Sequence, residues 1–171
     1  MRRTSGIISR QVRHMTGLVD DLLDVSRVTR GQVTIEPEPQ DMREIVASAI
    51  EQVRPMIAAR GHQLEQLLPG EQVLVLGDAN RLVQILTNLL NNAAKYTPDG
   101  GRLRLEVAAD AAQVLVAVSD NGIGIAPALH THVFELFTQA ERSSDRSQGG
   151  LGLGLALVKS LVELHGGRCA A

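Results

Sequence analysis

Aromatic residues are scarce in this sequence: its 171 residues include no tryptophan, one tyrosine and two phenylalanines. Proteins that bind single-stranded nucleic acid without sequence preference stack the bases on aromatic rings, and this chain has few rings to offer. A general excess of basic residues is also missing, because 17 Lys and Arg residues are outnumbered by 19 Asp and Glu residues. We therefore expect no nucleic-acid partner.

Cysteine and long hydrophobic runs are also lacking. Cys169 is the single cysteine, so no disulfide can form within the chain, which fits a reducing compartment. No apolar run approaches the roughly 20 residues of a membrane-spanning helix, and the opening residues, MRRTSG, do not lead into a signal peptide. We expect a globular, cytoplasmic chain without membrane contact of its own, within a parent protein that could be membrane-anchored.

Residues 1–31 have the pattern of one long helix that ends near Gly31. Apolar residues repeat at spacings of four and three, as in the seam of a coiled coil or helical bundle: they are Ile8, Val12, Met15, Val19 and Leu22. Such a seam would allow a homodimer. The same stripe would also suit a core helix of a larger domain.

Residues 32–171 alternate between helical and strand-like segments, which predicts an α+β fold, a two-layer α/β sandwich behind one long N-terminal helix. Asp41 and Asp78 are placed to cap two helices, and Pro55 should disturb the first of them. The expected strands are Val33–Glu38, His62–Leu67, Gln72–Leu76, Arg102–Ala108 and Gln113–Ser119. The second and third should pair with each other, and the last two should form a hairpin. The expected helices are Asp41–Arg60, Ala79–Tyr96, a short piece over Leu129–Phe137, and Leu155–His165.

The helix over Ala79–Tyr96 carries a polar stripe, because Asn88, Asn92 and Lys95 follow one another at spacings of four and three. A magnesium ion on a triphosphate prefers hard oxygen ligands such as the carbonyl of an asparagine side chain. A lysine one turn away suits the phosphate charge. The same residues would also suit the solvent margin of an ordinary amphipathic helix.

A second motif, DNGIGI, begins at Asp120 directly after a predicted strand. The carboxylate of Asp120 can accept a hydrogen bond from an amino group such as that of adenine. Gly122 and Gly124 allow the backbone to approach a flat ligand closely. The alternative is a common strand-to-helix turn.

A third motif, GGLGLG over residues 149–154, precedes the last helix. Free N–H groups at a helix start form a phosphate cradle. The motif is neither a P-loop, since no Lys-Ser or Lys-Thr follows the glycines, nor a dinucleotide-binding fingerprint, since no strand leads into it. The polar segment Thr138–Gln148 before it suits a lid over a nucleotide, although a flexible hinge would have similar glycines.

In this order and at these separations, the three motifs resemble the N, G1 and G2 boxes of histidine kinases, which share an ATPase group with DNA gyrase, Hsp90 and MutL. Residues 88–96 (NLLNNAAKY) resemble the N box, residues 120–124 the G1 box, and residues 150–154 the G2 box. Phe134–Phe137 resembles the F box. Residues 18–27 (LVDDLLDVSR) resemble the second helix of the kinase dimerisation domain, so residues 1–31 and 32–171 would be separate domains.

The resemblance implies the Bergerat-type ATP-binding fold, with ATP and Mg²⁺ as ligands. Asn92 would bind the metal with the help of Asn88. The residues that would contact ATP are Asn88, Asn92, Lys95, Tyr96, Asp120, Gly122, Gly124, Ile125, Gly150, Leu151, Gly152, Leu153 and Gly154. The implied reaction is transfer of the γ-phosphoryl group of ATP to a histidine of a phosphoacceptor domain, which serves a response regulator of the parent system.

Asn88 distinguishes among activities in this group. Relatives that hydrolyse ATP resemble one another in having a glutamate there, and an amide lacks the basicity to activate water. The kinase acceptor pattern, His-Glu-x-x-Thr-Pro, does not occur here, and His14 is followed by Met-Thr-Gly within the segment that resembles the second helix. We therefore expect the acceptor histidine outside this chain and no autophosphorylation. The alternatives are a regulatory module without activity, a gyrase-type or Hsp90-type ATPase, and a serine kinase of the anti-sigma type.

The C-terminal residues, Gly166–Ala171, resemble the entry to a strand that the family would continue and pair. We expect the loss of such a strand to leave a sheet edge exposed.

Overall fold

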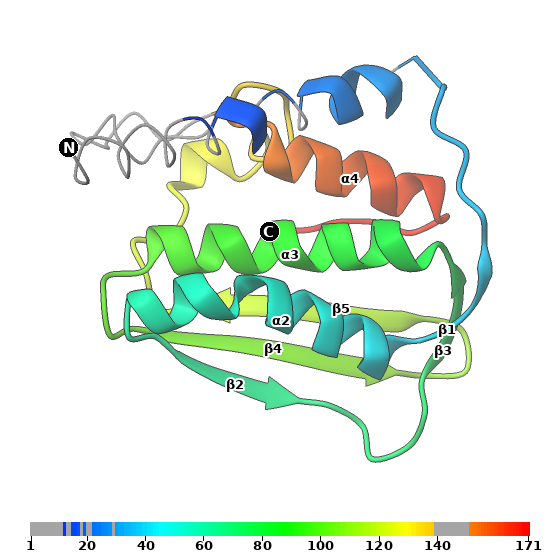
Figure 1. The fold of residues 1–171 in the computed structure, drawn as a ribbon, viewed down its shortest axis with the longest axis horizontal. Helices are drawn as coiled ribbons and strands as arrows, with labels where there is room; N and C mark the ends of the chain where they lie inside the picture. Colours follow the sequence, from blue (N-terminus) through cyan, green and yellow to red (C-terminus); the bar gives the residue numbers. More distant parts are fainter. Residues whose placement is uncertain (1–11, 13–14, 18, 20–21, 29, 139–150) are drawn as a thin grey trace.

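The computed structural model describes residues 12, 15–17, 19, 22–28, 30–138 and 151–171. Three helices cover one face of a sheet, and α3 lies between α2 and α4 (Figure 1). This two-layer arrangement confirms the predicted fold class. The elements are β1 (Glu38–Asp41), α2 (Met42–Ala59), β2 (Gln63–Leu67), β3 (Leu74–Gly77), α3 (Ala79–Tyr96), β4 (Arg102–Ala109), β5 (Val114–Asp120), the 3₁₀ turn η1 (Pro127–Leu129) and α4 (Gly154–Leu164).

The main sheet has the strand order β2-β4-β5, with β2 parallel to β4 and β5 antiparallel to it. β4 occupies the centre because its inward residues Leu103, Leu105 and Val107 are all buried under the helices. The hairpin of β4 and β5 is as predicted. The core lies between this face and the helices, where Leu90 of α3 and Leu157 of α4 are fully buried.

The predicted pairing of the two strands around Pro69-Gly70 is wrong. Both strands exist, but β2 pairs with β4, while β3 pairs antiparallel with β1 in a separate two-stranded sheet. The half-buried Leu64 of β2 lies opposite the buried Leu103 of β4, and this apolar contact between distant segments outweighs the local turn signal.

The predicted edge strand Val33–Glu38 is also displaced. The strand is Glu38–Asp41, and Pro39 lies opposite Leu76 of β3. A proline is tolerated here because β1 is an edge strand with a partner on one side only. Proline has no N–H group, and at such an edge the sheet does not need one. Val33 and Ile35 are half-buried while Thr34 is exposed, so their alternation reflects packing of extended chain and not strand pairing.

The two capped helices begin where the sequence predicts. Asp41 accepts a hydrogen bond from Arg43 N at 3.0 Å, and Asp78 accepts one from Arg81 N at 3.2 Å. α2 continues through Pro55 to Ala59, so the expected disturbance does not end it. Pro55 lies on the exposed side of α2, where water can bind the carbonyl group that its ring leaves unpaired.

The segment after β5 forms tight turns in place of the short helix predicted over Leu129–Phe137. Backbone bonds join residues three apart, from His132 N to Leu129 O at 2.9 Å and from Glu135 N to His132 O at 2.8 Å. Such spacing is typical of 3₁₀ turns. Phe137 then adopts a left-handed φ of 63°, which an α-helix does not permit.

The N-terminal stretch is helical at residues 12, 15–17, 19 and 22–28, as predicted. Val25 is buried in the core, and Asp24 accepts a hydrogen bond from Gln84 of α3 at 2.6 Å. The seam residues Val12, Met15, Val19 and Leu22 are exposed, Ile8 lies outside the described residues, and the role of the seam in a dimer stays a prediction. No helix in the described part of the chain is long and apolar enough to cross a membrane.

Residues 167–171 lie outside any helix or strand, and the strand that the family would continue from them stays a prediction. Cys169 lies half-buried against the core, and this burial raises the pKa of its thiol.

Candidate functional site

The polar stripe of α3 meets the start of α4. Asn88 and Asn92 are half-buried, and Gly154 lies close to both side chains. A Cβ atom added to Gly154 would lie 3.7 Å from Asn88 Oδ1 and 3.8 Å from Asn92 Nδ2. The fold therefore brings the asparagines of the first motif and the last glycine of the third motif together, although about sixty residues separate them in the sequence.

The start of α4 has no side-chain cap. Leu153 is the N-cap residue, and it makes no side-chain hydrogen bond to the helix, whereas aspartates cap both α2 and α3. An uncapped helix start leaves N–H groups and the positive end of the helix dipole available to an anion. These N–H groups begin beside Asn88 and Asn92.

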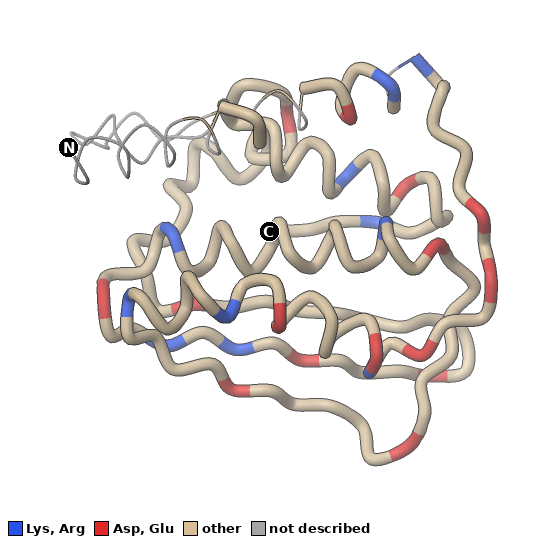
Figure 2. Tube along the Cα trace, viewed as in Figure 1, with Lys and Arg blue, Asp and Glu red and all other residues tan. Residues whose placement is uncertain are grey.

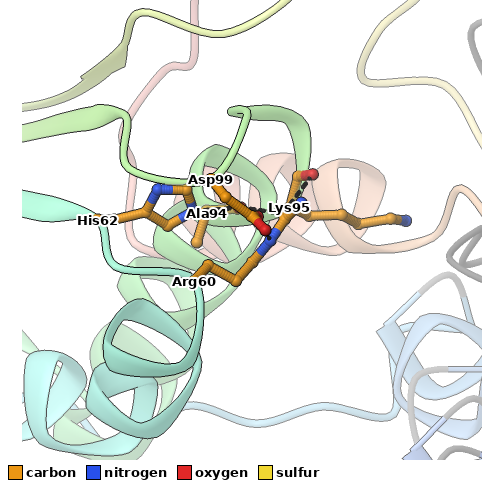
Figure 3. Close-up of polar contacts among 5 residues, drawn as sticks. All are labelled: Arg60, His62, Ala94, Lys95 and Asp99. Carbon is orange, nitrogen blue, oxygen red and sulfur yellow. Dashed lines mark hydrogen bonds and ion pairs between the residues drawn. The ribbon is translucent and has the colours of Figure 1, made fainter.

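The C-terminal end of α3 is held by the turn between α2 and β2 (Figure 3). Arg60 donates from Nη1 to the carbonyl oxygens of Ala94 and Lys95, the latter at 2.8 Å, and from Nε to Asp99 at 2.8 Å. His62 Nε2 donates to the Ala94 oxygen at 2.9 Å. The guanidinium charge of Arg60 also complements the negative end of the helix dipole. This network fixes the part of α3 that carries Lys95.

Sequence reasoning missed both Arg60 and His62 as contributors to the site. Neither lies in a motif, and the carbonyl groups that they bind are more than 30 residues away in the sequence. No local signal identifies such a pair.

Lys95 and Tyr96 lie next to each other at this end of α3. The ammonium group of Lys95 is 4.8 Å from the centre of the Tyr96 ring, within the range of a cation–π contact. Tyr96 is exposed. Basic segments are frequent at this end of the fold, whereas acidic ones are frequent near β1 and the start of α2 (Figure 2). Lys95 therefore places a positive charge beside the exposed ring of Tyr96.

The turn after β5 packs against the same end of α3. Asp120 Oδ1 accepts a hydrogen bond from Gly122 N at 2.8 Å, and Ile123 N donates to Tyr96 O at 3.2 Å. A Cβ atom on Gly122 would collide with Tyr96 O and lie 2.7 Å from Asp120 Oδ1 and 2.9 Å from Thr97 Oγ1. Glycine is thus required at position 122 for space.

Gly124 and Ile125 lie farther out on this turn. Gly124 has a φ of +68°, and no atom would lie within 4 Å of a Cβ added there. The left-handed backbone conformation, and not a lack of space, therefore favours glycine at this position. Ile125 is exposed, and its carbonyl oxygen accepts a hydrogen bond from His130 Nε2 at 3.0 Å. Among the described residues, neither makes a hydrogen bond to an asparagine of α3.

Thr97 is a further polar residue that the sequence did not indicate. It is 1% exposed and lies between Gly101 and Gly122. Its hydroxyl group has no hydrogen-bond partner among the described residues. A buried hydroxyl without a partner is costly, so this group is available to a ligand or to an ordered water molecule beside Asp120.

The third motif packs against the end of the F-box segment. Gly152 has a φ of +71°, and a Cβ atom there would lie 2.7 Å from Thr138 O and 3.1 Å from the carbonyl carbon of Phe137. Leu153 is buried and Leu151 is exposed. Gly150 and residues 139–148 of the predicted lid lie outside the described residues.

α3 therefore borders both halves of the candidate site. Asn88 and Asn92 face Gly154, and Tyr96 contacts the turn that carries Asp120. Eight residues of helix separate positions 88 and 96, or about 12 Å at 1.5 Å per residue. An extended ligand is needed to contact both ends.

A groove with a volume of about 730 Å³ lies on the side of α3 that faces α2. It borders Asn88 but not Asn92, Lys95, Asp120 or Gly154, so it shares only Asn88 with the site described above. Its lining residues are Gly17, Gln40, Glu44, Ile45, Ser48, Gln52, Ala79, Asn80, Val83, Gln84, Thr87, Asn88 and Asn91.

Comparison with known proteins identifies the family of this chain. The family model described as "Histidine kinase-, DNA gyrase B-, and HSP90-like ATPase" matches residues 77–171. The probable sensor histidine kinase TcrY of Mycobacterium tuberculosis is 37% identical over 160 residues, which are 94% of this chain and 33% of that protein. The chain thus spans about a third of the length of this curated relative.

Solved structures of histidine kinases share the fold. The mycobacterial sensor histidine kinase MprB is 33% identical with a TM-score of 0.65, over 77% of this chain and 81% of that chain. Full-length ShkA in complex with AMPPNP is 29% identical with a TM-score of 0.80, over 95% of this chain and 34% of that chain. The chain therefore belongs to the histidine kinase-, DNA gyrase B- and HSP90-like ATPase family, as the ATP-binding catalytic domain of a sensor histidine kinase.

Proposed function

We propose that this chain binds Mg-ATP along α3 and transfers the γ-phosphoryl group to a histidine that lies outside the chain. The observation that carries the proposal is the position of Gly154, at the uncapped start of α4, close to the side chains of Asn88 and Asn92. This arrangement combines free N–H groups for phosphate with amide oxygens for a metal ion. The crystallised relative ShkA was obtained with AMPPNP, which supports nucleotide binding by the shared fold.

Asp120 would bind the adenine. Its Oδ1 atom is held by Gly122 N at 2.8 Å, which fixes the carboxylate and leaves Oδ2 for the amino group of the base. Thr97 would bind a water molecule or the base through its buried hydroxyl group. Gly122, Gly124 and Ile125 would form the wall of the adenine pocket, with the exposed ring of Tyr96 beside them.

The triphosphate would lie against α4 and the polar stripe of α3. The N–H groups at Gly154 and the residues after it would bind phosphate oxygens, and Lys95 would add a positive charge. Gly150, Leu151, Gly152 and Leu153 would form the base of the lid over the phosphates.

Magnesium fits the donors present here. The side chains of Asn92 and Asn88 offer hard carbonyl oxygens of the kind that Mg²⁺ binds in small number while keeping its waters. When bound, the ion neutralises charge on the phosphates. Rotation of the Asn92 amide would turn its oxygen toward Gly154, where Nδ2 now lies.

Transfer to histidine follows from the chemistry at position 88. An imidazole nitrogen of the acceptor would form a bond to the γ-phosphorus while the bond to the β,γ-bridging oxygen breaks and ADP leaves. Asn88 offers no base to activate water, so the chain would position the reactants and stabilise charge without promoting hydrolysis. The acceptor domain and a response regulator would belong to the parent system, with residues 1–31 as a dimerisation helix and the assembly in the cytoplasm.

The test uses the whole chain, γ-labelled ATP and a separately produced helical domain that carries an acceptor histidine. We expect an acid-labile label on that histidine, strongly reduced in Asn92→Ala and Asp120→Ala. Steady release of phosphate without an acceptor would instead indicate an ATPase. Absence of nucleotide binding in the native chain would indicate a regulatory module.

A further inference from the structure

α4 contacts α3 at both of its ends, and its C-terminal end is fixed by a single histidine. We propose that His165 is a positioning residue for the nucleotide site, which holds α4 on α3 so that Gly154 stays against Asn88 and Asn92. This inference rests on the proposed function, because the property that it explains is the affinity for Mg-ATP.

Both ring nitrogens of His165 are used. Nε2 accepts a hydrogen bond from Asp78 N at 3.1 Å, and Nδ1 lies 2.7 Å from Leu161 O. Since a backbone N–H can only donate and a carbonyl oxygen can only accept, Nδ1 carries the proton and the ring is neutral. The imidazole therefore joins the last turn of α4 to the residue that caps α3.

The space around the ring supports a fixed position. A Cβ atom on Gly77 would lie 3.0 Å from His165 Cδ2, 3.3 Å from Nε2 and 2.8 Å from Leu82 Cδ1. Gly77 has no left-handed φ, so glycine is present there because the ring and Leu82 occupy the room that a side chain would need. The ring is thus in close contact with backbone on the α3 side.

Among the described residues, no other side-chain hydrogen bond joins α4 to the residues of α3 or its cap. The carboxylate of Asp78 is already occupied, since Oδ1 accepts from Arg81 N at 3.2 Å and Oδ2 from Glu36 N at 3.4 Å. The buried residues of α4 are all apolar, namely Ala156, Leu157, Val158 and Leu161. Apolar burial is non-directional and does not by itself prevent α4 from sliding or rotating.

The effect on the site follows from the stiffness of α4. The helix has 11 residues, from Gly154 to Leu164, and its ends are about 15 Å apart at 1.5 Å per residue. A helix of this length moves as a unit. Release of His165 from Asp78 therefore lets the start of α4 move relative to Asn88 and Asn92, where geometry decides phosphate binding.

The experiment compares three variants of the whole chain by calorimetric titration with Mg-ATP and by denaturant unfolding. His165→Leu removes both hydrogen bonds. His165→Gln keeps one donor and one acceptor on a flexible side chain. Val162→Ala is the matched control, because Val162 is a half-buried residue of the same helix that packs against the core and makes neither bond.

We expect His165→Leu to weaken Mg-ATP binding about tenfold, the equivalent of one or two net hydrogen bonds. His165→Gln should restore affinity to within about threefold of native. Val162→Ala should lower the unfolding midpoint and leave affinity within about twofold, since a loss of core packing alone does not release the junction.

Native affinity in His165→Leu, or an equal loss of affinity in Val162→Ala, would overturn the positioning role. If His165→Leu does not fold, Gly77→Ala decides, because its new Cβ displaces the ring without removing it; native affinity in that variant would also overturn the role. Failure of the native chain to bind Mg-ATP would refute the proposed function itself. This outcome differs from failure of the positioning role, in which the native chain binds Mg-ATP and the variants bind it equally well.

Discussion

Replacement of Gly122 by alanine tests the turn that carries Asp120. The new methyl group would collide with the Tyr96 carbonyl oxygen and lie 2.7 Å from Asp120 Oδ1 and 2.9 Å from Thr97 Oγ1. The carbonyl is backbone at the end of α3 and cannot rotate away. The turn must therefore move off α3 and take the Asp120 carboxylate with it.

Overpacking of this kind costs about 1–3 kcal/mol. The free protein can relieve the strain by displacing the turn, but the bound state needs Asp120 in its original place, so binding restores the strain. The same free energy then appears as weaker affinity, about 5- to 150-fold. We expect the unfolding free energy to fall by less than the binding free energy, because the displaced turn is exposed.

Titration of Gly122→Ala with Mg-ATP, together with denaturant unfolding, measures both quantities. Gly70→Ala is the control, since Gly70 has no left-handed φ and no atom lies within 4 Å of its added Cβ; it should change neither quantity. If Gly122→Ala binds Mg-ATP as tightly as the native chain, the adenine does not bind at this turn.

Three further predictions concern polar groups of the fold. Asp120→Asn keeps an acceptor for Gly122 N but loses the charged acceptor for the adenine amino group, and should weaken ATP binding about 10- to 100-fold in titration. Arg60→Ala removes the donor of the Lys95 carbonyl group and leaves the Ala94 carbonyl group with His62 alone, and should lower the unfolding free energy by about 1–3 kcal/mol in urea; unchanged stability would contradict the capping role. Partial burial opposes ionisation of Asp78, yet backbone hydrogen bonds from Arg81 and Glu36 outweigh it and lower the pKa of this carboxyl group. The Asp78 carboxylate therefore stabilises the fold at pH values above its unfolded pKa near 3.9, and this stabilisation is lost as the pH falls through its lower folded pKa. Over that acid range, the unfolding free energy measured in urea should fall less for Asp78→Asn than for the native chain.

Several elements could be predicted from the sequence because their signals are local. Asp41 and Asp78 cap their helices, and the apolar spacing identifies the faces that α2 and α3 bury. The hairpin of β4 and β5 follows from two alternating segments joined by a short connection. In each case the interacting residues are close in the sequence, so periodicity and capping chemistry suffice.

Strand pairing was not determined locally. β2 pairs with β4 and not with β3, which follows it in the sequence, although α3 also lies between β2 and β4 along the chain. This pairing gives the inner face of the sheet more apolar contact. The turns over residues 127–137 and the strand at Glu38–Asp41 also differ from prediction. These outcomes depend on partners that are distant in the sequence, and no local pattern specifies a distant partner.

The residues of the candidate site divide in the same way. The sequence alone determined their chemistry: amides and a lysine along one stripe of a helix, a carboxylate at a strand end, and glycines before the last helix. Only the tertiary structure decided their arrangement, with Gly154 against Asn88 and Asn92, Gly122 beneath Tyr96, and the ends of α3 held by Arg60 and His165. The physical reason is that residue type and spacing fix which groups a segment offers, whereas the packing of distant segments fixes which of those groups meet.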